Sequence, residues 1–83
     1  MIRAYVKIND LNDIVKLNKA SAACKCKMAI YSGVKILNPK SLIMLFELSM
    51  GSTFPLVAKI NDHETEKDFL EKFKGLIVSY VYY

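Results

Sequence analysis

The sequence predicts an α+β open-faced sandwich, in which a four-stranded antiparallel sheet carries three helices on one face. The main observation is a hydrophobic pattern that switches along the chain between alternation, typical of strands, and a period of about 3.6, typical of helices. The second is size, because 83 residues, of which 53% are hydrophobic, can form one small core but not two. We therefore expect a single domain over residues 1–83, with the order strand, helix, strand, strand, helix, strand, helix.

The first strand is expected over residues 2–8, because apolar residues occupy alternate positions there. Asn9 and Asp10 supply side-chain oxygens that can cap a first helix over residues 11–23, and Asp13 adds a carboxylate to its first turn. Five residues of this segment recur at helical spacing, namely Leu11, Ile14, Val15, Asn18 and Ala22.

A β-hairpin is predicted next. Residues 25–32 alternate again, residues 34–37 resume a strand pattern, and the Ser32-Gly33 pair between them can adopt the positive backbone angles of a tight turn. Asn38-Pro39 ends the second of these strands, because proline has no N–H to donate to a ladder.

A second helix is predicted over residues 42–50, with Ser41 as its N-cap and Gly51 at its end. The fourth strand follows over residues 53–60. Pro55 lies near the start of this strand, so we expect ladder pairing to begin only after it.

The last helix is expected after a polar loop over residues 61–64, where Thr65 and Asp68 approximate a capping box. Its apolar face is formed by Phe69, Phe73, Leu76, Ile77 and Tyr80. The tail over residues 77–83 is rich in β-branched and aromatic residues, so it can continue the helix, add an edge strand or form a dimer contact. We favour a helix end that frays or pairs.

The segment Asn38–Ser49 reads NPKSLIMLFELS, and it resembles the regulatory-serine helix of HPr, the histidine phosphocarrier of the bacterial sugar phosphotransferase system. The predicted element order also matches that of HPr over nearly the whole chain. The match by residues is confined to the region from Lys40 to Ser49. The resemblance implies an HPr-like fold and protein partners from the phosphotransferase or catabolite-control network.

The histidine that makes such a protein a carrier is missing from its usual place. In the family, a Gly-(Ile/Leu)-His-Ala-Arg-Pro-like segment follows the first strand, whereas here Ile8–Ile14 contains neither His nor Arg nor Pro. The single histidine, His63, is expected in the loop before the last helix, away from that position. Asp10 is an alternative acceptor, but no magnesium-binding carboxylate cluster accompanies it, so we interpret it as a helix cap.

Two features of the second helix are candidate sites. Ser41 matches the serine that a dedicated kinase phosphorylates in many Gram-positive members of the family, although a serine before an apolar run is also a common N-cap. The helix is apolar almost all round. If Leu45 and Leu48 face the core, then Leu42, Ile43 and Phe46 project outward, where the family places its docking patch.

The remaining chemistry of the chain is sparse. Cys24 and Cys26, one residue apart, are expected to be reduced thiols, because a bridge between them would be strained and no further ligands complete a metal site. The net charge of +4 is spread over solvated faces and Arg3 is the only arginine, which disfavours a nucleic-acid partner. We recognise no catalytic constellation, cofactor motif or membrane-spanning run, and we expect a cytoplasmic protein that is not an enzyme.

The function predicted from the sequence is therefore that of an HPr-like regulatory module without the phospho-accepting histidine. It would bind proteins through its second helix, under phosphorylation of Ser41. Two alternatives stay open at this point, namely a true phosphocarrier with an atypical acceptor and a dimerising structural domain.

Overall fold

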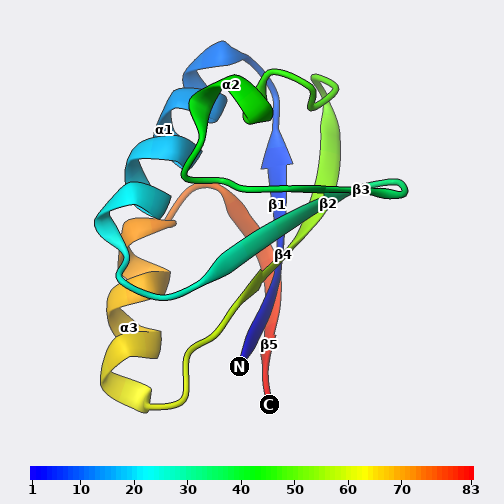
Figure 1. The fold of residues 1–83 in the computed structure, drawn as a ribbon. Coiled ribbons are helices and arrows are strands. Elements are labelled where there is room, and N and C mark those ends of the chain that lie inside the picture. The colour runs from blue at the N-terminus through cyan, green and yellow to red at the C-terminus, as the bar shows by residue number, and fades with distance from the viewer.

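The computed structural model describes all 83 residues as one antiparallel sheet with helices on one side (Figure 1). The strands, in the order β3-β2-β4-β1-β5 across the sheet, are β1 (Ile2–Ile8), β2 (Met28–Ser32), β3 (Lys35–Leu37), β4 (Ser52–Ala58) and β5 (Ile77–Tyr82). The helices are α1 (Leu11–Ala23), α2 (Leu42–Leu45) and α3 (His63–Lys72). The α+β architecture is as expected, but the sheet has a fifth strand.

Strand β1 lies inside the sheet, between β4 and β5. Its alternation is confirmed, since Ile2, Ala4, Val6 and Ile8 are buried and the residues between them are not. Pro55 does not delay pairing as expected, because β4 pairs with β1 along its whole length, with Pro55 opposite Tyr5. Strand β2 pairs with β4 only as far as Leu56, so the missing N–H of Pro55 lies just beyond that ladder.

Helix α1 has the predicted bounds and the predicted cap. The Asp13 N–H donates to Asp10 Oδ1 at 3.0 Å, and the Asn9 N–H donates to Asp13 Oδ2 at 2.9 Å, so the two carboxylates cap the helix reciprocally. The inner face of α1 differs from the spacing noted in the sequence. Its buried residues are Ile14, Leu17, Ala20 and Ser21, whereas Leu11, Val15 and Ala22 are exposed.

Helix α2 is shorter than expected, because it ends at Leu45 and not near residue 50. Beyond it the chain continues in tighter i to i+3 turns, with N–H bonds from Phe46 to Ile43 O and from Leu48 to Leu45 O. The Gly51 N–H then donates to Ile8 O at 2.6 Å, and Gly51 has a φ of 82°. The chain must reach the end of β1 at this point to begin β4, which stops the helix early.

Helix α3 begins two residues before the predicted capping box. Its N-cap is Asp62, whose carboxylate accepts from the Thr65 N–H at 2.9 Å and from Thr65 Oγ1 at 2.8 Å. The assignment of Thr65 and Asp68 to a capping box is therefore wrong, since Asp62 occupies the position from which a side chain reaches the free N–H groups. His63, expected in a loop, is the first residue of α3.

The tail is a strand and not the end of a helix, which corrects the predicted four-stranded sheet to five strands. Helix α3 ends at Lys72, and Gly75 with a φ of 91° turns the chain back along β1. Strand β5 pairs antiparallel with β1, with Ile2 opposite Tyr82 and Tyr5 opposite Ser79, and an irregularity follows at the next pair.

One hydrophobic core of 19 buried residues lies between the sheet and the helices. At its centre Phe69 of α3 and Phe73, the C-cap of that helix, stack with ring centroids 4.4 Å apart. Both side chains are buried against the inner side of the sheet, so they are the largest contribution of α3 to the fold. No helix is long and apolar enough to cross a bilayer.

Candidate functional site

Three apolar side chains project from α2 and its C-cap and form what we call the α2 patch, namely Leu42, Ile43 and Phe46. Their exposed fractions are 37%, 81% and 55%, while Leu45 and Leu48 are buried in the core. The expected division of this segment into inner and outer residues is therefore present in the structure. The docking role of the patch stays a prediction.

Two residues of α1 extend the exposed apolar surface toward α2, and sequence reasoning did not assign them there. Leu11 and Val15 share a helix face with Asn18, because the three positions are spaced by four and three residues. The Asn18 Nδ2 donates to Pro39 O at 3.3 Å, which places this face beside the segment that leads into α2. The helical spacing in the sequence indicates that these residues share one face of α1. This face does not lie against the sheet.

The segment before Ser41 is held firmly against α1. Pro39 is buried, and the Lys40 Nζ donates to Cys24 O at 2.8 Å at the end of α1. The Asn38 side chain accepts from the Lys40 N–H at 3.0 Å, and its carbonyl accepts from the Ser41 N–H at 2.9 Å. These contacts fix the start of α2 relative to α1.

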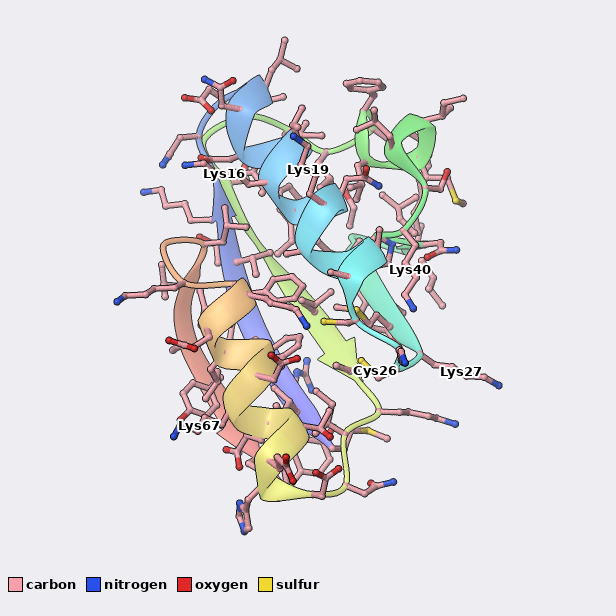
Figure 2. The ribbon with its side chains drawn as sticks, turned by 90° about the vertical axis from the view of Figure 1, so that its left-hand side faces the viewer. Lys16, Lys19, Cys26, Lys27, Lys40 and Lys67 are labelled. Carbon is pink, nitrogen blue, oxygen red and sulfur yellow. The ribbon has the colours of Figure 1, made fainter.

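Ser41 occupies the N-cap position of α2, as the sequence predicts, but its hydroxyl makes no capping hydrogen bond. Its side chain is half-buried. Lys16 and Lys19 of α1 and Lys40 beside Ser41 lie on one side of the molecule (Figure 2). The hydroxyl is therefore not committed to the helix cap.

The position at which the phosphocarrier family holds its histidine, the start of α1, is occupied by carboxylates. The hydrogen bonds of Asp10 and Asp13 are to backbone N–H groups of the first turn and of Asn9. These are the N–H groups that a phosphoryl group at a helix start would need. The geometry matches helix capping.

His63 lies at the other end of the molecule from the start of α1 (Figure 1). Its exposed ring stacks on Tyr82 of β5 with centroids 5.2 Å apart, and its Nδ1 is 2.8 Å from Glu66 Oε1. Asp62 and Glu66 thus place negative charge beside the imidazole, and Asp62 already binds the free N–H of Thr65. Added phosphate would meet repulsion here.

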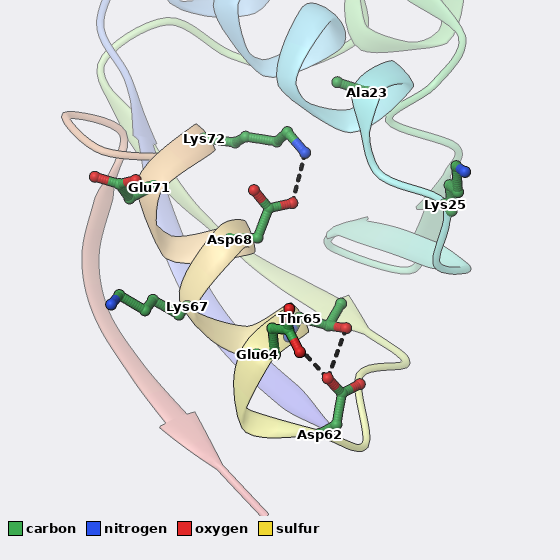
Figure 3. A pocket seen from close by; sticks show the side chains of 9 residues that line it. All are labelled: Ala23, Lys25, Asp62, Glu64, Thr65, Lys67, Asp68, Glu71 and Lys72. Carbon is green, nitrogen blue, oxygen red and sulfur yellow. Dashed lines mark hydrogen bonds and ion pairs between the residues drawn. The ribbon is translucent and has the colours of Figure 1, made fainter.

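A hollow of about 570 Å³ lies between the end of α1 and the outer face of α3 (Figure 3). Its walls are polar, with Ala23 as the single hydrophobic residue. On its α3 side Lys72 Nζ donates to Asp68 Oδ2 at 2.6 Å, and this contact raises the pKa of Lys72. No cluster of three or more His, Cys, Asp and Glu side chains is arranged to hold a metal ion. The hollow presents one ion pair and no reactive constellation.

Cys24 and Cys26 are free thiols. Burial raises the pKa of the Cys24 thiol, and the neighbouring Cys26 raises it further. A raised pKa lowers the fraction of thiolate, which is the nucleophilic form, so the buried thiol is unreactive at neutral pH.

The cap of α3 predicts a pH dependence of stability. Hydrogen bonds from Thr65 lower the pKa of Asp62, so its carboxylate stabilises the fold above its unfolded pKa of about 3.9, and this contribution is lost as the pH falls through the lower folded value. We expect Asp62→Ala to lower the urea midpoint of unfolding at pH 7. The difference in urea midpoint between the variant and wild type should become smaller at acidic pH. Asp68→Ala, which removes an exposed ion pair, should change little. A gap for Asp62→Ala that is independent of pH would contradict this role.

Comparisons with known proteins identify the fold. No protein-family model matches the chain, and no curated protein sequence matches it significantly. Among solved structures, the chain is similar to the crystal structure of HPr-C-His from Thermoanaerobacter tengcongensis, with a TM-score of 0.66 and 15% sequence identity. The match covers 86% of this chain and 89% of the other. At this identity the likeness shows an HPr-like fold.

Proposed function

We propose that this protein is an HPr-like regulatory module that binds other proteins through α2 and does not carry phosphoryl groups on histidine. The observation that carries the proposal is the α2 patch, in which three apolar side chains on α2 and its C-cap remain uncovered. Burying such side chains in an interface is favourable by about 25 cal/mol per Å² of apolar surface. The HPr-like fold supports partners from the phosphotransferase or catabolite-control network.

The surroundings of the patch suit a docking surface. Two hydrogen bonds tie the segment 38–41 to α1 and its C-cap, and two more hold the turn of the segment itself, so little ordering is needed when a partner binds. Leu11 and Val15 widen the apolar surface, and Lys16 and Lys19 provide a basic border on α1. This combination of an apolar centre and a charged rim favours a partner with acidic residues around an apolar pocket.

The two predicted acceptor alternatives are less well supported. At the start of α1, Asp10 and Asp13 are engaged in capping. At the start of α3, His63 stands among carboxylates. We therefore place docking ahead of phosphoryl transfer.

Ser41 is the proposed regulatory site. Transfer of the γ-phosphoryl group of ATP to its hydroxyl, with loss of the hydroxyl proton, would add about −1.5 to −2 charges beside the patch. Because the hydroxyl makes no capping bond, modification would break none. Phosphoserine beside Lys40 would change the electrostatics of the docking surface and hence the choice of partner.

Docking is tested by titrating the isotope-labelled protein with a catabolite-control regulator of a Gram-positive bacterium and, separately, with the general phosphotransferase that acts on HPr. We expect backbone amide shifts confined to residues 41–50 and nearby α1. Ile43→Lys and Phe46→Lys should each weaken binding at least tenfold, which corresponds to about 1.4 kcal/mol.

The matched control is Ile36→Lys, because Ile36 on β3 is exposed to 62% yet lies outside the patch. It should bind like wild type. Equal loss of binding in Ile36→Lys would show that apolar exposure in general, and not α2, drives the interaction. Absence of binding to both proteins would overturn the proposed partners.

Phosphorylation is tested by measuring the mass of the intact protein after incubation with each phosphoryl donor. The protein is incubated with ATP and an HPr kinase, and separately with phosphoenolpyruvate and the general phosphotransferase. We expect one phosphate in the first reaction only, and none in Ser41→Ala. One phosphate from phosphoenolpyruvate, lost in His63→Ala, would instead support the carrier alternative.

A further inference from the structure

Strand β5 forms one edge of the sheet, and its outward backbone groups can be identified from the ends of the chain. The Tyr83 N–H donates to Met1 O at 2.8 Å, and the Met1 amino group donates to Tyr83 O at 2.6 Å, so these residues form a hydrogen-bonded pair. In an antiparallel ladder such pairs recur at every second residue. Val81 and Ser79 therefore also point their N–H and C=O groups toward β1. The N–H and C=O groups of Tyr80 and Tyr82 point outward and have no strand partner.

From Ser79 onward this edge lacks the features that usually prevent pairing with another chain. Residues 77–83 contain no charged side chain and no proline, and Val78, Tyr80 and Val81 are exposed. The opposite edge, β3, is only three residues long and begins with Lys35, which pairs with Glu47 at 2.9 Å. Short edge strands and edge lysines oppose strand addition. Of the two edges, β5 alone is open to a further strand.

We propose that β5 pairs antiparallel with the β5 strand of a second copy of this chain, around a twofold axis at Tyr80. The outward-facing residues fix this register. With Tyr80 opposite Tyr80 of the second copy, the outward N–H and C=O groups of the two Tyr80 residues pair with each other across the axis. A shift by one residue would leave these donors and acceptors unpaired.

The side chains along β5 suit a second copy of themselves. No charged side chain is brought against a like charge within β5 in this register. The two Tyr80 side chains form an aromatic cross-strand pair at the axis. Each Tyr82 is already fixed by its stack on His63, which lowers the entropy lost on association.

Helix α3 lies beside β5, and its Lys67 and Glu71 are on the side directed toward that strand (Figure 3). A twofold axis through β5 sets two copies of α3 antiparallel on the same side of the joined sheet. The α2 patch lies at the far end of the sheet from the end of β5 and remains uncovered (Figure 1).

The oligomeric state tests this interface. We expect the full chain to show a concentration-dependent dimer in sedimentation and in native mass spectrometry. Tyr80→Pro removes an outward N–H and no N–H that pairs with β1, so it should leave the circular dichroism spectrum unchanged and give a monomer. Tyr80→Phe, which keeps the backbone and the ring, and Ile36→Lys on the other edge should both remain dimeric.

A second measurement fixes the register. In a background of Cys24→Ala and Cys26→Ser, Tyr80→Cys should be joined to itself efficiently by a short thiol-reactive cross-linker, because facing residues of a hydrogen-bonded pair have Cα atoms about 5.5 Å apart. Ile36→Cys should not be joined. A wild-type protein that stays monomeric at several hundred micromolar, or a dimer that survives Tyr80→Pro, would overturn the proposal. Loss of binding through α2 would leave it unaffected.

Discussion

Replacing Phe69 by alanine is expected to lower the free energy of unfolding by about 3–5 kcal/mol, the largest effect of any single change considered. Phe69 is 1% exposed and stacks on Phe73 at the centre of the only large core. Truncation removes the burial of an aromatic ring and leaves a cavity that Phe73 cannot fill. For a chain of 83 residues this approaches the whole stability of the domain.

Urea denaturation followed by circular dichroism measures this loss. Phe46→Ala is the matched control, because the same side chain is removed from an exposed position on α2. It should change the free energy of unfolding by less than about 0.5 kcal/mol, as surface substitutions usually do. A large effect of Phe46→Ala would mean that the α2 patch packs into the fold and is not free for a partner.

The second large effect is expected from proline at Ser79. Its N–H points toward Tyr5 of β1, so Ser79→Pro removes a ladder hydrogen bond, leaves an acceptor on β1 unpaired and clashes with the neighbouring strand. We expect the free energy of unfolding to fall by about 2–4 kcal/mol. The neighbouring substitution Tyr80→Pro, in which the missing N–H points outward, should be far milder.

Both variants are compared with wild type at a protein concentration low enough for the monomer to dominate. The contrast between adjacent positions isolates backbone pairing from the general effect of proline in the strand. Equal destabilisation by Ser79→Pro and Tyr80→Pro would show that the inward and outward residues of β5 are not as assigned.

The first half of the fold could be predicted from the sequence because local signals there agree with one another. The alternating pattern over residues 2–8 is followed almost directly by the capping residue Asp10, which marks the start of a helix. The strand that comes next limits the length of this helix. The hairpin was also predictable, although its first strand begins at Met28 and not at residue 25.

The last strand could not be assigned reliably, since its pattern satisfies two periods. Phe73, Leu76, Ile77 and Tyr80 have helical spacing, yet β-branched and aromatic residues prefer strands. Gly75 was the deciding residue, because its positive φ ends the helical course. Its partner strand, β1, lies at the other end of the chain, and a local sequence pattern does not indicate such a long-range pairing.

The candidate site was predictable to the same mixed degree. The excess of apolar residues after Ser41 could not all be buried, so exposure of Leu42, Ile43 and Phe46 followed from the composition of the segment. The neighbouring Leu11 and Val15 were missed, because helical spacing shows that residues share a face but not what that face contacts.

The hydrogen bonds between Met1 and Tyr83 have a consequence for how the chain reaches its fold. Strand β1 precedes the other strands in the sequence, but it pairs with β4 and β5, which lie in the second half. The centre of the sheet can therefore form only after large loops have closed. Such non-local pairing slows folding. Joining the two ends by a short turn, with new ends opened at the exposed Gly33 of the β2–β3 hairpin, would turn the most distant pairing into a hairpin and shorten the search for the native topology.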